Sequence, residues 1–165
     1  MTSLLFGVTA VHAADLAGTS ELPLSELQSP ASYVGANSST VLQAGQHNNA
    51  SIVQQGGANI VNASQTGVRG NLSLRQQGGG NRAAVEQAGV NNALSLAQSG
   101  YLNHADVQQA GTSNRSEIEQ IGFGHSSYVR QYGHNNRVDI SQYGVGQLAV
   151  VKQYGSGDTA TVVQY

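Results

Sequence analysis

Residues 43–54 read QAGQHNNASIVQ, and the glutamine that opens this segment returns eleven residues later at its end. The same step continues to the end of the chain. Its glutamines are Gln43, Gln54, Gln65, Gln76, Gln87, Gln98, Gln109, Gln120, Gln131, Gln142, Gln153 and Gln164. A glycine follows two residues later in each unit long enough to hold one: Gly45, Gly56, Gly67, Gly78, Gly89, Gly100, Gly111, Gly122, Gly133, Gly144 and Gly155. A period held over this many units predicts a repeat architecture.

Within each unit the polar and apolar residues alternate. The fifth residue after the glutamine is usually asparagine: Asn48, Asn59, Asn81, Asn92, Asn103, Asn114 and Asn136. The seventh and ninth are small or aliphatic, as Ala50 and Ile52 are, whereas nearly all charges fall at the sixth, eighth and tenth positions. This alternation predicts a strand whose odd positions face inward. An amphipathic helix would need apolar residues three or four apart, and that spacing is absent.

An odd period requires a bend in every unit. A strand simply continued would turn its inner face outward in the next unit. We therefore expect the residues from the glycine to the asparagine to form a tight turn, in which glycine supplies a positive φ. Two strand–turn units then make one coil, and residues 34–165 supply six coils. At the strand spacing of a β-sheet, six coils rise about 29 Å.

The predicted fold is thus all-β, a two-sheet β-solenoid. Gln43 should lie on Gln65 and Gln87, and the amides of such a column can satisfy one another along the axis. The motif continues to Gln164 with no sign of a terminal cap. An uncapped strand edge without proline pairs readily with another chain. We therefore expect head-to-tail stacking into a cross-β fibre.

Composition excludes several classes of function. Charged residues make up 10% of the chain, the net charge is −2, and there is no cysteine. No basic stripe favours nucleic acid, and thiolate metal sites and disulfides are ruled out. The histidines show no metal-ligand spacing, and no nucleophile elbow, phosphate loop or dinucleotide fingerprint appears. We predict no enzyme activity, metal, cofactor or small-molecule substrate.

The segment before the repeats differs in character. Residues 1–13 resemble a secretory signal, with an apolar run followed by Val11-His12-Ala13 as a cleavage site. A buried apolar segment is the alternative. Residues 14–36 hold both prolines and are interpreted as an extended leader. The repeat array is assigned to residues 37–165.

The repeat resembles that of the curlin family. The resemblance lies in Gln43, Gly45, Asn48, Ala50 and Gln54, and returns in residues 76–87 and 153–164. It implies a subunit of extracellular amyloid fibres that serve adhesion and biofilm matrix. It also implies a companion subunit, a periplasmic chaperone, export through a dedicated outer-membrane pore and assembly at the bacterial surface. By this resemblance, the inner glutamines and asparagines carry polymerisation.

The family has a major fibre-forming subunit and a minor, nucleating subunit. Residues 14–36 lack the Gly/Asn-rich leader of the major type, and residues 43–50 are closer to the nucleator pattern. The last unit is neither degenerate nor basic, which is closer to the major type. The assignment is open between the two, with the minor type favoured.

Two surface features have alternative interpretations. Tyr132, Tyr143, Tyr154 and Tyr165 follow four successive glutamines and should stack in pairs. They either only stabilise the last coils or form an end interface for growth or partner binding. Arg115 should lie over Arg137, and Glu117 over Asp139. These charges either form a solvated face or slow assembly before export.

A second function from another class is a soluble, monomeric β-solenoid that binds a surface such as carbohydrate or ice. Such a protein would show a flat outer face on which one pattern, for instance Thr-x-Thr, repeats from coil to coil. It would also show a terminal cap. The sequence shows neither.

Overall fold

A computed structural model describes residues 35–165 of the chain. The predicted signal at 1–13 and nearly all of the predicted leader at 14–36 lie outside the described residues. The strands are β1 (Ser38–Gln46), β2 (Asn49–Gly57), β3 (Ile60–Val68), β4 (Asn71–Gly79), β5 (Arg82–Val90), β6 (Ala93–Tyr101), β7 (His104–Thr112), β8 (Arg115–Phe123), β9 (Ser126–His134), β10 (Arg137–Val145), β11 (Leu148–Ser156) and β12 (Thr159–Gln164). The described part contains no helix that could span a membrane.

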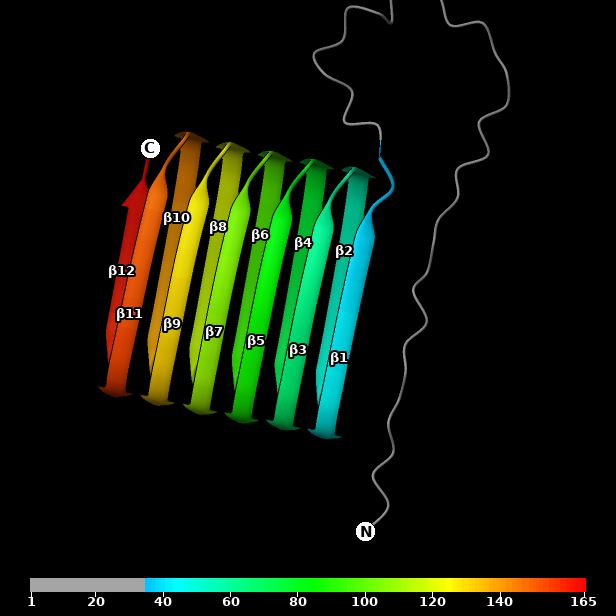
Figure 1. Cartoon of the computed structure of the whole chain (residues 1–165). Helices are drawn as coiled ribbons and strands as arrows, with labels where there is room; N and C mark the ends of the chain where they lie inside the picture. The colour runs from blue at the N-terminus through cyan, green and yellow to red at the C-terminus, as the bar shows by residue number, and fades with distance from the viewer. Residues whose placement is uncertain (1–34) are drawn as a thin grey trace, which may run out of the picture.

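The strands alternate between two parallel sheets (Figure 1). The first sheet has the order β1-β3-β5-β7-β9-β11, and the second sheet has the order β2-β4-β6-β8-β10-β12. Each strand pairs with the strand two further along the chain, so that Gln43 lies beside Gln65 and Gln54 beside Gln76. The arrangement is the predicted β-solenoid, with two strands per coil and six coils. The fold prediction is therefore confirmed.

The core is a thin apolar seam between the two sheets. It consists of the inward residues at the seventh and ninth positions: Val61, Ala63, Leu72, Leu74, Ala83, Val85, Leu94, Leu96, Ala105, Val107, Ile118, Val129, Val138, Ile140, Ala149 and Val151. Val41, Ala50, Ile52, Ala160 and Val162, in the first and last coils, are only partly buried. Within the described residues, the interior is therefore closed in the middle coils and less covered in the first and last coils.

The bends are tighter than the sequence predicted. Strand pairing continues through the glycine, as at Gly56, and only two residues separate β2 from β3. Coil-to-coil bonds persist there, with the Ala58 amide donating to the Gly35 carbonyl over 2.7 Å. Two left-handed residues produce each bend: Gly56 has φ 98° and Ala58 has φ 58°. The second left-handed position was not predicted, because seven units place a residue other than glycine there.

Candidate polymerisation site

The inward glutamines form two continuous ladders along the axis. Nε2 of Gln65 donates to Oε1 of Gln87 over 2.7 Å, and also crosses the seam to the carbonyl of Asn49 over 3.2 Å. The same axial bond joins every glutamine to its partner one coil on, with lengths between 2.6 and 2.9 Å. Those of the middle coils are fully buried. The ladders thus satisfy polar groups that would be costly to bury alone.

The ladders have a direction. Each Nε2 donates toward the C-terminal coils, so within the described residues Oε1 of Gln43 and of Gln54 receives no bond. At the other end, Nε2 of Gln153 and of Gln164 donates only across the seam, to the carbonyls of Arg137 and Leu148. One end therefore presents acceptors and the other presents donors.

The asparagines bind the bends together. Oδ1 of Asn59 accepts the backbone N–H of Asn81, one coil further, over 3.0 Å. Its Nδ2 donates to the carbonyls of Gln55 in its own bend and of Gly78 in the next coil. Each asparagine therefore satisfies backbone groups of two successive bends.

Asn59, Asn81 and Asn103 form a column along the axis, and His125 and Gln147 continue it. The sequence did not predict this role for either residue. His125 is fully buried, and its Nε2 donates to the carbonyl of Ile121 over 3.2 Å. Its Nδ1 accepts the backbone N–H of Gln147 over 3.3 Å, which requires the neutral ring. Gln147 in turn donates its side-chain amide to Tyr143. Their place at the fifth position was the only signal in the sequence.

The glycines of the repeat are required by the closeness of the coils. A Cβ on Gly78 would lie 2.0 Å from the carbonyl oxygen of Gly100. The same obstruction, at 1.8–2.0 Å, occurs at every such glycine from Gly45 to Gly133. At Gly144 and Gly155 the nearest atom is 3.8 Å and 3.7 Å away, because no further coil covers them.

The predicted tyrosine pairs are in contact. The rings of Tyr132 and Tyr154 stack at a centroid distance of 5.5 Å, and those of Tyr143 and Tyr165 at 5.7 Å. The Tyr143 hydroxyl donates to Oε2 of Glu119 over 2.7 Å, which raises the pKa of Tyr143 above its ordinary value. The sequence did not indicate Glu119, which lies on the neighbouring strand β8, diagonally opposite Tyr143 of β10.

Charges on the second sheet pair with one another. Arg137 lies beside Arg115, and Asp139 beside Glu117, as predicted. Arg115 contacts Glu117 at 3.2 Å, and Arg137 contacts Asp139 at 2.7 Å and Glu117 at 3.9 Å. The hydrogen bond with Asp139 raises the pKa of Arg137. Three of the side chains are about half exposed and Asp139 is less so, at 29%, so the net contribution of these pairs to stability is small.

The geometry defines a class of protein: a stacked two-sheet solenoid whose polar ladders end, within residues 35–165, in amide groups that lack an axial partner. The family model described as curlin associated repeat matches residues 71–100, 102–133 and 133–165, more than half of the chain. The chain belongs to the curlin family, a family of structural subunits, and its repeats support a curli-type structural subunit. Neither the curated proteins nor the solved structures give a match to the chain.

Proposed function

We propose that the protein polymerises head to tail into extracellular amyloid fibres that serve adhesion and biofilm matrix. The direction of the glutamine ladders supports this proposal most strongly. Within the described residues, Nε2 of Gln153 and of Gln164 has no axial acceptor at one end, and Oε1 of Gln43 and of Gln54 has no axial donor at the other. A second copy placed on the C-terminal end meets these donors with its own acceptors.

The repeat count keeps such a junction in register. Six complete coils separate one end from the other. The next copy therefore brings Gln43 over Gln153, Gln54 over Gln164 and Ile52 over Val162. Gly45 lies over Gly155, at the position that a further coil fills elsewhere in the solenoid. The inner glutamines and asparagines and the bend glycines are thus assigned to polymerisation.

The family supplies the remaining parts of this proposal. Export would pass through the periplasm, with a chaperone, and through a dedicated outer-membrane pore to the cell surface. The signal at 1–13 would direct the chain into this route, and residues 14–36 would form an extended leader. A companion subunit would share the fibre, and the protein would act as the minor, nucleating subunit.

A pair of variants tests the head-to-tail junction. Ile52→Lys places a charge in the seam at the N-terminal end, and Val162→Lys does so at the C-terminal end. A junction needs an intact C-terminal end on one copy and an intact N-terminal end on the next, and each variant has only one of the two. Neither variant alone should therefore form a fibre. In an equimolar mixture, the intact C-terminal end of Ile52→Lys can join the intact N-terminal end of Val162→Lys. The mixture should therefore form dimers, measured by analytical ultracentrifugation.

Val163→Lys is the matched control, because Val163 is a neighbour in β12 whose side chain is 51% exposed. It should form fibres with the 4.7–4.8 Å cross-β reflection, as the unaltered protein should. Fibres from Val162→Lys alone would contradict the junction. Unaltered protein that stays monomeric and gives no such reflection would favour a soluble, surface-binding solenoid instead. Seeding the major subunit with this protein tests the nucleating role.

A further inference from the structure

The outer face of the first sheet carries charges that have no partner within the described residues. Glu86 and Asp106 lie on β5 and β7, and Arg130 and Lys152 on β9 and β11. Their side chains take part in none of the ion pairs of residues 35–165, all of which lie on the second sheet. The face is therefore acidic toward its N-terminal half and basic toward its C-terminal half. Arg82 also lies on this face, at the start of β5.

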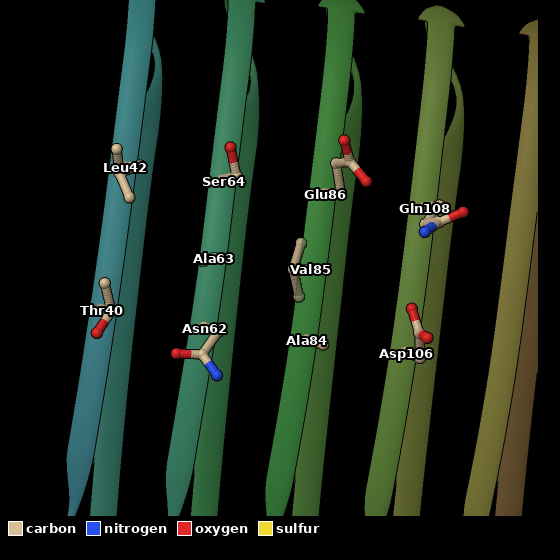
Figure 2. Close-up of a pocket in the computed structure, with 10 residues that line it drawn as sticks. All are labelled: Thr40, Leu42, Asn62, Ala63, Ser64, Ala84, Val85, Glu86, Asp106 and Gln108. Atoms are coloured by element: carbon tan, nitrogen blue, oxygen red, sulfur yellow. The ribbon is translucent and has the colours of Figure 1, made fainter.

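The two halves also differ in shape. The acidic half contains an open hollow of about 470 Å³ over β1, β3, β5 and β7, as Figure 2 shows. Small residues such as Ser64 and Ala84 line it, with Glu86 and Asp106 at one side. The basic half contains a smaller hollow of about 190 Å³ beside Tyr128 and Val150. It also carries a ridge of large exposed side chains: Tyr128, Tyr132, Val150 and Tyr154. A hollow and a ridge of opposite charge on one face are complementary to each other.

We propose that this face pairs with the same face of a second copy, with the two solenoid axes antiparallel. A two-fold axis along the strand direction, between β7 and β9, places β5 opposite β11 and β7 opposite β9. Glu86 then lies opposite Lys152, and Asp106 opposite the Tyr128 hydroxyl. Three alanines receive the ridge: Ala84 lies opposite Val150, Ala88 opposite Tyr154 and Ala110 opposite Tyr132. Such an isologous contact uses one patch twice.

The same alignment holds along a fibre. In a head-to-tail stack, β1 of the next copy follows β11 along each fibre. This β1 lies opposite β3 of the other fibre. The outward residues there carry no charge, with Thr40 and Leu42 on one strand and Asn62 and Ser64 on the other. Elsewhere Arg82 lies opposite Leu148, His104 opposite Ser126, Gln108 opposite Arg130, and Thr112 opposite His134. No two like charges meet at any coil.

The area of contact predicts that pairing needs fibres. Four strands of nine residues cover roughly 19 by 30 Å, about 570 Å² on each copy. A stable interface typically buries about 800 Å² on each partner. A single pair of copies is therefore weak, whereas a fibre repeats the contact and gains avidity. The pairing rests on the proposed function, because it joins fibres rather than monomers.

Charge reversal tests the pairing. Fibres of the unaltered protein should appear as laterally joined pairs in electron micrographs and separate as salt rises from about 0.15 M to about 1 M. Glu86→Lys with Asp106→Lys should give single fibres, and so should Arg130→Glu with Lys152→Glu. The variant with all four changes restores opposite charges and should form pairs again. Glu117→Lys with Asp139→Lys makes the same change of net charge on the second sheet and should leave pairs intact.

The outcomes separate this inference from the proposed function. Unaltered fibres that stay single, or pairs that survive the reversal of Glu86 and Asp106, would overturn the pairing and leave the fibre subunit standing. Unaltered protein that forms no fibre contradicts the proposed function and the pairing together. Equal loss of pairs in the second-sheet control would show that net charge, not this face, governs the contact.

Discussion

Gly111 and Gly133 lie so close in adjacent coils that a Cβ on Gly111 would stand 2.0 Å from the Gly133 carbonyl oxygen. Gly111 also has φ 120°, which L-residues with a side chain rarely adopt. Gly111→Ala should therefore separate two coils and strain the backbone, at a cost above about 3 kcal/mol. We expect the guanidinium concentration that dissolves the assembled protein to fall sharply.

Gly146→Asn is the matched control for this prediction. Gly146 has φ 70°, and nothing lies within 4 Å of an added Cβ. Asn135 occupies the equivalent place one unit earlier with φ 56°. The variant should stay within about 1 kcal/mol of the parent. Equal damage from both changes would show that the bend, rather than the closeness of the coils, requires glycine.

The buried glutamines should be hard to replace. Gln98→Ala removes the acceptor of Gln76 Nε2 and the donor to Gln120 Oε1, and each unpaired buried group costs about 1–3 kcal/mol. We expect a loss of about 3 kcal/mol or more, measured by denaturant titration. Gln77→Ala, at the exposed neighbour, should change stability by less than about 0.5 kcal/mol. Similar losses for both would contradict a special role of the ladder.

The sequence was sufficient to predict the coil, because the glutamine step is odd and the pattern within each unit is that of a strand. Those two facts require one bend per unit and place Gln43 over Gln65, where the structure has it. The second left-handed residue of each bend could not be predicted. Residues as different as Ala58, Arg69 and Leu102 occupy it, and no single residue type recurs in every unit.

The substituted members of the asparagine column were also missed. His125 lacks an amide, yet its two ring nitrogens lie where they can donate to Ile121 and accept from Gln147. Whether a histidine makes such bonds depends on distances that spacing alone does not give. The bond from Tyr143 to Glu119 joins residues 24 apart, and a pattern based on steps of eleven does not indicate it.

This role of His125 gives a further prediction. His125→Asn should restore the amide that the rest of the column uses, so stability should be kept or raised. His125→Leu fills similar space but leaves the Gln147 N–H and the Ile121 carbonyl without these partners, at about 1–3 kcal/mol each. Denaturant titration of both variants separates hydrogen bonding from packing. If the leucine variant is as stable as the asparagine variant, the ring acts only by filling space.

The tyrosine pairs should act on stability rather than on growth. Removing one stacked pair should cost about 0.5–1.5 kcal/mol. Tyr143→Ser with Tyr165→Ser is therefore expected to lower the denaturant midpoint of the fibres while leaving the lag time of seeded growth unchanged. Tyr132→Ser with Tyr154→Ser serves as the matched pair in the first sheet. A longer lag for the first variant alone would instead assign an end interface to Tyr143 and Tyr165.

The bond between Tyr143 and Glu119 makes the last coils sensitive to alkaline pH. This bond raises the pKa of Tyr143 above the ordinary value of 10, so folding stabilises the protonated phenol. The contribution to stability is complete below the pKa of an unfolded tyrosine, near 10, and is lost as pH rises through the higher pKa of the folded state. Glu119→Gln removes the charged acceptor and should move the Tyr143 titration toward lower pH. Tyrosinate absorbance, with Tyr143→Phe subtracted, measures this titration. An unchanged curve in Glu119→Gln would mean that burial or Tyr165, rather than Glu119, sets the pKa of Tyr143.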